Sequence, residues 1–167
     1  HRGLKKFALV ILTLLVIQLT YGAFMAGLKA ATAAPTWPDI NGAFIPQNLT
    51  TYQGRTMSAF SALVNNPIVV HVVHRNLAYL ITVLVLCWTM VAYSQRRSRA
   101  FTKARWWPLV LVSVQVFLGI MAVLKSYKAI PQGWGLFEWM AQLHQVVGIL
   151  LLLSMVLVLY LLRFTKG

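Results

Sequence analysis

Four long apolar stretches constrain this chain more than any other feature of its sequence. They run over about residues 7–28, 67–93, 106–124 and 139–162. A helix needs roughly 20 apolar residues, each rising about 1.5 Å, to cross about 30 Å of hydrocarbon, and each stretch is long enough. Because a backbone in lipid must satisfy its own hydrogen bonds, we expect every stretch to be one α-helix. The sequence predicts an all-α integral membrane protein, a four-helix transmembrane bundle forming a single domain over residues 1–167.

The composition agrees with a membrane protein and excludes several other classes. Of the 167 residues, 59% are hydrophobic and only 10% are charged, whereas about a quarter of an average soluble domain is charged. Fifteen Lys and Arg residues oppose two acidic residues, so the net charge is +13. We interpret the cations as topology signals flanking the spans and predict a lipid bilayer, not a nucleic acid, as the partner. The scarcity of carboxylates excludes most acid–base and two-metal mechanisms.

The distribution of basic residues predicts the orientation of the chain. An even number of spans places both termini on one side, with the loop between the second and third spans. That side carries ten Lys and Arg residues, and the other side carries five together with both acidic residues. The basic segments of the first side are residues 2–6, 96–105 and 163–166. The positive-inside rule therefore predicts that both termini are cytoplasmic or, in a mitochondrion, in the matrix.

Two loops are expected on the outer side. The long one covers residues 29–66, and its three prolines together with Gly42 indicate turns. Within it, Thr50 to Val64 is expected to form a short amphipathic helix. The second loop, Lys125 to Glu138, is short.

A weak internal repeat relates the first two spans to the last two. In each half a glutamine precedes a glycine by four residues in one span, and a histidine lies near the start of the next span. The members are Gln18, Gly22 and His74 in the first half, and Gln115, Gly119 and His144 in the second. This order predicts two helical hairpins related by a pseudo-twofold axis.

His74 and His144 are the strongest candidate metal ligands. Counted at about 1.5 Å per residue, both lie roughly 7–11 Å inside the outer boundary of their spans. Ionisable residues at such a depth are costly and usually functional. Two histidines at equal depth on different helices can bind one iron from both sides of a haem. The alternative is that each histidine only bridges helices by a hydrogen bond. A zinc site is disfavoured because no third or fourth ligand lies near.

Other polar residues near the outer side are candidates to bind the same haem. Cations there are suited to pair with haem carboxylates. These cations are Arg75, Lys29, Lys125 and Lys128. Gln18 and Gln115 can donate hydrogen bonds to a cofactor or simply hold helices together. His71 shares a helix face with His74, so it is a candidate to bind a propionate or carry protons; the alternative is a solvated histidine at the interface.

Several motifs along the chain resemble the haem A synthase family. Residues 22–30 resemble the end of the first span in one half of that family, and residues 36–46, with Thr-Trp-Pro and Ile-Pro, resemble its outer loop. Residues 73–78 resemble its His-Arg ligand motif. Residues 115–119 resemble its Gln-x-x-Leu-Gly element, and residues 144–145 its His-Gln element. The resemblance keeps this order over nearly the whole chain.

The resemblance implies a four-helix half of an eight-span oxidoreductase, and the chain looks like the C-terminal half. Such an enzyme oxidises a methyl group of haem O, through an alcohol, to the formyl of haem A for cytochrome oxidase. The resemblance implies that His74 and His144 are axial ligands of a b-type haem, with Arg75 following the first ligand. The implied partners are the N-terminal half or a second copy, holding haem O or haem A, and cytochrome oxidase or its assembly factors. The implied location is the bacterial cytoplasmic membrane or the mitochondrial inner membrane.

One position departs from the family's pattern. The substrate-binding half of the family has a glutamate three residues before the histidine of the His-Arg motif, and here that position is His71. The chain therefore resembles the cofactor-haem half, and its sequence identifies no catalytic residue. One alternative is a non-enzymatic b-type haem subunit that transfers electrons in a respiratory complex. Another is a structural membrane subunit without a cofactor.

Overall fold

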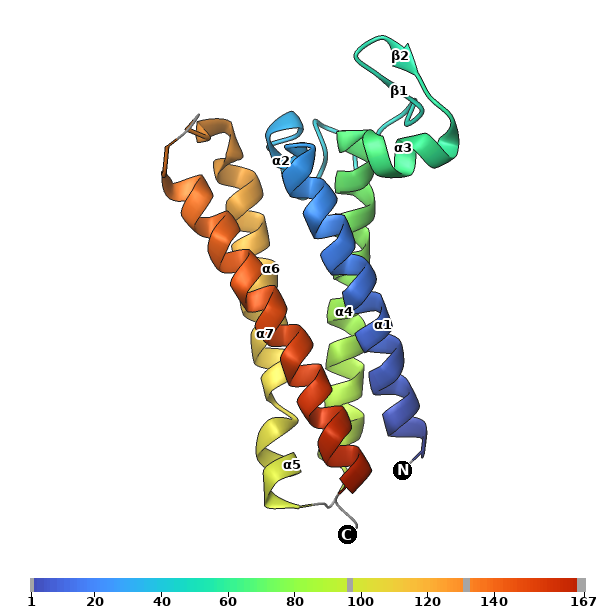
Figure 1. Cartoon of the computed structure of the whole chain (residues 1–167), viewed down its shortest axis with the longest axis vertical. Helices are drawn as coiled ribbons and strands as arrows, with labels where there is room; N and C mark the ends of the chain where they lie inside the picture. Colours follow the sequence, from blue (N-terminus) through green and yellow to red (C-terminus); the bar gives the residue numbers. More distant parts are fainter. Residues whose placement is uncertain (1, 96–97, 131–132, 165–167) are drawn as a thin grey trace.

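Four long helices dominate the computed structural model, which describes residues 2–95, 98–130 and 133–164 (Figure 1). They are α1 (Arg2–Gly27), α4 (Pro67–Tyr93), α6 (Trp107–Lys125) and α7 (Leu136–Phe164). Four helical segments of the described chain are long and apolar enough to cross a membrane, and each corresponds to one of these helices. The prediction of an all-α membrane bundle is confirmed. Both ends of the chain lie at the same end of the bundle, as an even number of spans requires (Figure 1).

The first and last helices are longer than predicted. α1 begins at Arg2 and not near Phe7, and α7 begins at Leu136 and not near Trp139. A count of apolar residues misses such helix ends. A helix continues beyond the hydrocarbon wherever polar groups form hydrogen bonds with the N–H and C=O groups of its last turn. Arg96, Arg97 and Lys166, which contribute to the charge asymmetry, lie outside the described residues.

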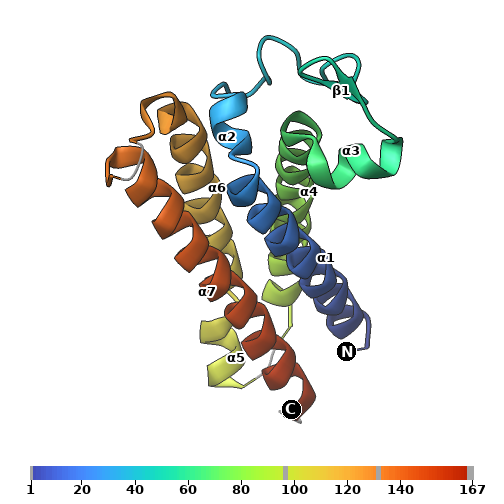
Figure 2. The same ribbon diagram turned by 45° about the horizontal axis from the view of Figure 1, so that its top comes forward.

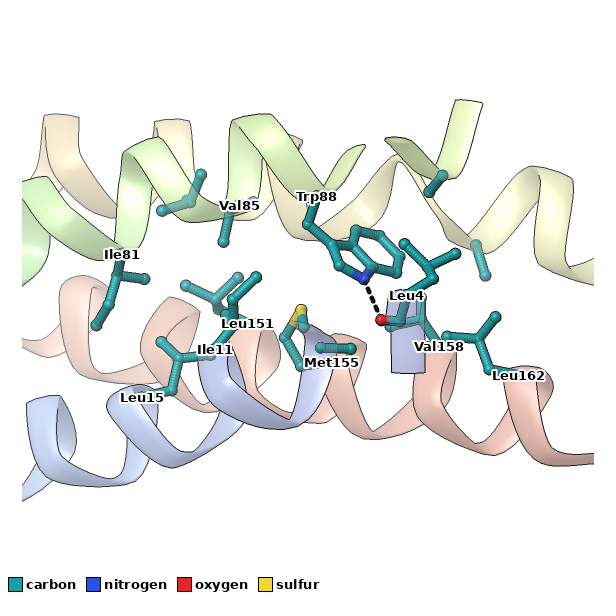
Figure 3. Packing of buried hydrophobic residues seen from close by; sticks show 14 of the residues in the cluster. Leu4, Ile11, Leu15, Ile81, Val85, Trp88, Leu151, Met155, Val158 and Leu162 are labelled. Carbon is teal, nitrogen blue, oxygen red and sulfur yellow. Dashed lines mark hydrogen bonds between the residues drawn. The ribbon is translucent and has the colours of Figure 1, made fainter. Parts of the chain in front are cut away.

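The helices pack as two hairpins, α1 with α4 and α6 with α7, as the internal repeat predicts. The hairpins approach one another toward the chain termini and diverge toward the opposite, outer end (Figures 1 and 2). Side chains from all four long helices form a buried cluster in the half of the bundle near the termini (Figure 3). Its members include Leu4, Ile11 and Leu15 of α1, Val85 and Trp88 of α4, Val112 of α6, and Met155 and Val158 of α7.

The long outer loop contains more structure than expected. It begins with α2 (Ala30–Ala33) and later forms a β-hairpin of β1 (Thr51–Tyr52) and β2 (Arg55–Thr56), followed by α3 (Ala59–Asn65). The prediction of a helix beginning at Thr50 is therefore wrong for its first half. Gln53 and Gly54 join the strands with φ angles of 51° and 75°. Positive φ at both central residues makes a two-residue hairpin turn, and α3 begins only after Ser58 caps it.

A short helix and one buried arginine close the end of the bundle near the termini. After α5 (Arg99–Ala104), Arg105 lies against the last turn of α4, with 8% of its surface exposed. Its Nη1 donates to the carbonyl oxygens of Ala92 at 3.1 Å and Tyr93 at 3.0 Å. The Ala92 carbonyl also accepts from the main-chain N–H of Gln95 at 3.2 Å. The cation therefore adds hydrogen bonds to the last carbonyls of α4, where the helix dipole favours positive charge. At the outer end, a turn of 3-10 helix, η1 (Ser126–Lys128), follows α6.

Candidate functional site

The structure brings the rings of His74 of α4 and His144 of α7 together across the bundle. Their ring centroids are 6.3 Å apart, and the ring planes are inclined by 69°. Each histidine belongs to a different hairpin, and along its helix each lies farther from the chain termini than the members of the buried cluster. Residues separated by 70 positions in the sequence thus form one pair.

Hydrogen bonds to the facing helix orient the His144 ring. Its Nδ1 lies 3.0 Å from the main-chain oxygen of Gln115 on α6. A carbonyl oxygen only accepts, so Nδ1 carries the proton and Nε2 keeps its lone pair. The side-chain Nε2 of Gln115 donates to that lone pair at 3.3 Å. Metal-binding histidines commonly have this pattern, in which the distal nitrogen donates to a carbonyl and fixes the tautomer.

His74 has the corresponding glutamine but not the corresponding carbonyl. The Nε2 of Gln18 on α1 lies 3.3 Å from the ring Nε2 of His74 and donates to its main-chain oxygen at 3.0 Å. The Nδ1 of His74 is buried with no hydrogen-bond partner among the described residues. The repeat seen in the sequence is therefore a repeated glutamine–histidine contact, with one difference in how the ring is held.

Glycines on the facing helices make room for these rings. A Cβ atom at Gly119 would lie 2.9 Å from Cε1 of His144, which is too close, whereas one at Gly22 would lie 3.6 Å from Cε1 of His74. Both glycines belong to the repeat in the sequence, whereas a third glycine in this layer, Gly148, was not predicted. A Cβ atom there would lie 3.1 Å from Nε2 of Gln115. The sequence spacing could have identified Gly148, because this residue follows His144 by one helical turn and so lies on the same helix face.

Buried polar atoms without partners are concentrated in this layer. Of five such side-chain atoms in the described part of the chain, four belong to the glutamines and histidines discussed above. They are Oε1 of Gln18, Oε1 of Gln115, Nδ1 of His71 and Nδ1 of His74. Buried polar groups are nearly always hydrogen-bonded in native proteins, so this concentration indicates that the layer accommodates a further polar or metal-containing group.

The residues fit a metal ion held between two imidazoles and supplied with its other ligands from elsewhere. In zinc sites the metal lies about 2.0–2.1 Å from an imidazole nitrogen. Two imidazole rings on opposite sides of one metal at this distance have centroids roughly 6 Å apart. The observed 6.3 Å agrees with this separation. The described residues contain no group of three or more His, Cys, Asp or Glu suited to hold a metal. A haem, whose macrocycle supplies four nitrogen ligands, matches a site with only two protein ligands.

His71 lies one turn before His74 and is buried, with 3% of its surface exposed. The alternative of a solvated interfacial histidine is therefore wrong. It lies on the same helix face as His74, as the spacing predicted.

Arg75 anchors the outer loop to α4. Its Nη1 donates to the main-chain oxygen of Pro38 at 2.7 Å, its Nη2 donates to that of Phe44, and its guanidinium carbon lies 4.3 Å from the centroid of the Phe44 ring. The side chain is 6% exposed. The sequence did not predict this loop contact; the predicted pairing with a haem carboxylate remains a prediction.

The anchored loop segment is itself held by an acidic residue. Asp39 accepts a hydrogen bond from the main-chain N–H of Gly42 at 3.0 Å, across a turn in which Asn41 and Gly42 have positive φ. This hydrogen bond, with a contribution from Thr36, holds the pKa of the Asp39 carboxyl below its usual value. Residues 39–42 of the outer loop therefore form a defined, hydrogen-bonded turn.

The predicted outer lysines lie at the ends of helices. Lys29 follows α1 in a left-handed conformation with φ of 50° and is exposed, and Lys125 is the half-buried last residue of α6. Lys128 in η1 is exposed beside the ring of Tyr127. All three lie at the end of the bundle opposite the chain termini. That this end faces outward, and that these lysines pair with a cofactor, remain predictions.

Comparison with known proteins agrees with the motifs. A family model, COX15-CtaA, described as "Cytochrome oxidase assembly protein", matches residues 1–156. The chain belongs to this family. Relatives named "Heme A synthase" include those of Pelagibacter ubique, 30% identical over 92% of this chain and 41% of the relative, and of Rhodopseudomonas palustris (strain HaA2), 33% identical over 92% and 39%. That of Sinorhizobium medicae is 38% identical over 80% of this chain and 35% of the relative.

The family membership confirms the resemblance identified from the sequence. The chain spans about two fifths of the length of the first of these relatives. No solved structure matches the chain.

Proposed function

We propose that this chain is the cofactor-haem half of a haem A synthase, in which His74 and His144 are the axial ligands of a b-type haem. The observation that carries the proposal is the histidine pair itself. Two imidazole rings from opposite hairpins lie 6.3 Å apart, each with its Nε2 next to a glutamine amide, in a chain of this family.

The residues around the pair have defined tasks in this proposal. When bound, a b-type haem supplies one-electron transfer. The Gln115 carbonyl holds the proton of His144 on Nδ1 and so increases the basicity of Nε2. Without a metal, the side-chain amides of Gln18 and Gln115 contact the ring Nε2 atoms and orient the two rings. A bound metal would replace these amides as the partner of each Nε2. The outer cations Arg75, Lys29 and Lys125 balance the haem carboxylates.

The proposed reaction of the whole enzyme is the oxidation of a haem O methyl group to the formyl of haem A for cytochrome oxidase. The substrate haem binds in the other half, or in a second copy, because this half has His71 where the family's substrate half has a glutamate. We place the protein in a bacterial cytoplasmic or mitochondrial inner membrane, with both termini on the cytoplasmic or matrix side. The excess of basic residues at that end supports this orientation.

A reduced-minus-oxidised optical spectrum with haem extraction tests the ligand assignment. The chain purified under conditions that retain haem is expected to show a low-spin b-type signal at about one haem per chain, because two strong-field imidazoles complete the coordination of iron. His74→Ala and His144→Ala are expected to abolish the signal. His71→Asn is the control, since this histidine is buried one turn away on the same helix, and it is expected to retain the signal. A colourless native protein, or a signal that survives either alanine variant, contradicts the proposal.

A second candidate function is electron transfer without haem A synthesis, and the histidine at position 71 favours it. A chimera separates the two functions. In it, this chain replaces the corresponding segment of the Sinorhizobium medicae relative, and conversion of haem O is measured in membranes. Conversion that depends on His74 and His144 supports the haem A synthase. A chimera that binds haem normally but produces no haem A supports the electron carrier.

A further inference from the structure

The end of the bundle near the chain termini carries positive charge with no acidic side chain to balance it. The two acidic residues of the sequence, Asp39 and Glu138, lie in the outer loop and at the outer end of α7. Glu138 accepts hydrogen bonds from the main-chain N–H groups of Ile130 and Gly135, so it is engaged locally. The described chain therefore supplies no acidic side chain to the end of the bundle near the termini.

An apolar groove opens at this end, between the last turns of α4 and the first turn of α6. Its volume is about 320 Å³. It is lined by Leu86, Thr89, Met90, Tyr93, Trp106 and Leu109. The hydroxyl of Thr89 donates to the Val85 carbonyl, so it presents no free polar group to the groove. From Tyr93 to Leu86 the groove extends roughly 10 Å along α4, at about 1.5 Å per residue.

The groove faces the lipid and ends at aromatic residues. The side chains of Leu86, Met90 and Trp106 are all exposed on the surface of the bundle. The rings of Tyr93 and Trp106 meet edge to face, with centroids 5.9 Å apart, at the level of the helix ends. Aromatic side chains of this kind mark the depth of the lipid headgroups. An occupant thus has its apolar part in the groove and its polar part beside these rings.

Arg105 supplies positive charge at the aromatic end of the groove. Its guanidinium carbon lies 5.0 Å from the centroid of the Tyr93 ring. Nη1 donates to main-chain carbonyls, whereas Nε is buried with no partner among the described residues. Nη2 makes none of the hydrogen bonds found in the described part of the chain. The preceding helix, α5, adds the exposed cations Arg99 and Lys103.

We propose that this groove is a binding site for an anionic glycerophospholipid of the leaflet next to the chain termini. One acyl chain lies along Leu86 and Met90, and the phosphate is bound by the exposed Arg99 and Lys103. The largely buried Arg105 contributes positive charge beside them. Basic side chains at the end of an apolar interhelical groove are the pattern by which membrane proteins recognise anionic headgroups. The site is independent of haem, because it lies at the opposite end of the bundle from the histidine pair.

Fluorescence quenching by brominated lipids tests the site. The full chain is reconstituted in phosphatidylcholine bilayers that contain a minor fraction of phosphatidylglycerol, with bromine on the acyl chains of one lipid or the other at equal amounts. Brominated phosphatidylglycerol is expected to quench tryptophan fluorescence more than brominated phosphatidylcholine, because the site concentrates the anionic lipid beside Trp106. The excess is expected to disappear in Trp106→Phe. Trp107→Phe is the matched control, since Trp107 is exposed at the same depth but does not line the groove, and it is expected to retain the excess.

Two charge variants distinguish a specific lipid-binding site from a general attraction of anionic lipids to the basic surface of the bundle. Arg99→Gln/Lys103→Gln is expected to bring the ratio of the two quenching efficiencies to one. Arg2→Gln/Lys6→Gln removes the same charge from exposed positions on α1 and is expected to leave the ratio unchanged. The proposal is overturned by equal quenching in the native chain, which would indicate that a protein segment or a neutral lipid fills the groove. The proposal is also overturned if the excess quenching by phosphatidylglycerol survives in Trp106→Phe, or if both charge variants reduce that excess equally.

Discussion

His144 is more closely confined than His74. Its Nδ1 donates to the Gln115 carbonyl, and its ring lies against the backbone at Gly119, where a Cβ atom would approach Cε1 to 2.9 Å. At Gly22 the corresponding distance to the His74 ring is 3.6 Å, which is ordinary van der Waals contact. The two glycines occupy equivalent places in the repeat, but only Gly119 is required by the packing.

Gly119→Ala is expected to displace the His144 ring, whereas Gly22→Ala is expected to leave His74 in place. Overpacking of this kind costs about 1–3 kcal/mol, so the free energy of unfolding of Gly119→Ala should fall by that amount and the low-spin haem signal should weaken or shift. Gly22→Ala serves as the control and should change neither. Thermal unfolding in detergent and the optical spectrum measure both effects. Equal changes in stability and in the haem spectrum of the two variants would contradict the conclusion that only Gly119 is required by the packing.

Arg75→Lys is expected to release the outer loop while keeping the positive charge. A lysine cannot reproduce the forked contact with two carbonyl groups, and a hydrogen bond from a charged group contributes about 1.5–3 kcal/mol. The amide of Ala43, which bonds to the Ile40 carbonyl, should therefore exchange with solvent faster. Hydrogen exchange measured by mass spectrometry checks this. Arg55→Lys, in the exposed strand β2, should have no effect on the same amide; unchanged exchange in Arg75→Lys would argue against the anchor.

At the scale of elements, two short turns shape the outer loop. Residues 41–42 and 53–54 each have positive φ at both positions, and each turn joins antiparallel backbone. Asn-Gly is the sequence that most favours such a turn, whereas Gln-Gly is a weaker signal. The helix predicted over residues 50–64 fails for this reason, since the glycine directs the chain into a hairpin before Ser58 starts α3.

Opposite effects are expected from two substitutions in the 53–54 turn. Gly54→Ala places a Cβ atom at φ of 75° and should destabilise the hairpin by about 1 kcal/mol. Gln53→Asn makes the turn Asn-Gly and should stabilise it. The amide of Met57, which bonds to the Thr50 carbonyl at 2.9 Å, reports on the hairpin through hydrogen exchange. A change of the same sign in both variants would show that the turn geometry does not control the hairpin.

At the scale of the whole molecule, the bundle has a packed half and a polar half. The packed half, near the termini, contains the buried cluster around Trp88, whose Nε1 donates to the Leu4 carbonyl at 3.2 Å (Figure 3). The polar half contains the histidines, the glutamines and most of the buried atoms that lack partners. Stability and the candidate site are therefore expected to respond to different substitutions.

Trp88→Phe is expected to lower stability without affecting the histidine pair. Loss of the hydrogen bond to Leu4 costs about 0.5–1.5 kcal/mol, and the smaller ring leaves a cavity that adds to this cost. Unfolding in detergent should show the decrease, while the optical spectrum of bound haem should stay unchanged. Trp107→Phe, at an exposed position, should change neither quantity. A spectral change in Trp88→Phe would show that the two halves are coupled.

Features that depend on apolar length, depth in the membrane and local order follow from the amino-acid sequence alone. Apolar length predicted four helices, because a backbone in lipid has few other solutions. The repeated order of glutamine, glycine and histidine predicted two related helical hairpins. The equal depth of His74 and His144 predicted that the two histidines can face each other across the bundle. The family motifs lie in the same order along the chain and needed no structure.

The contacts between groups that are distant in the sequence could be seen only in the folded structure. The rotation of each helix about its axis and the path of a loop depend on packing over the whole molecule, and local sequence does not specify them. For that reason the contact of Arg75 with the Pro38 and Phe44 carbonyls, the burial of His71 and the space that Gly148 provides for Gln115 were all missed. The groove between α4 and α6 also arises from packing, since residues from two helices form it.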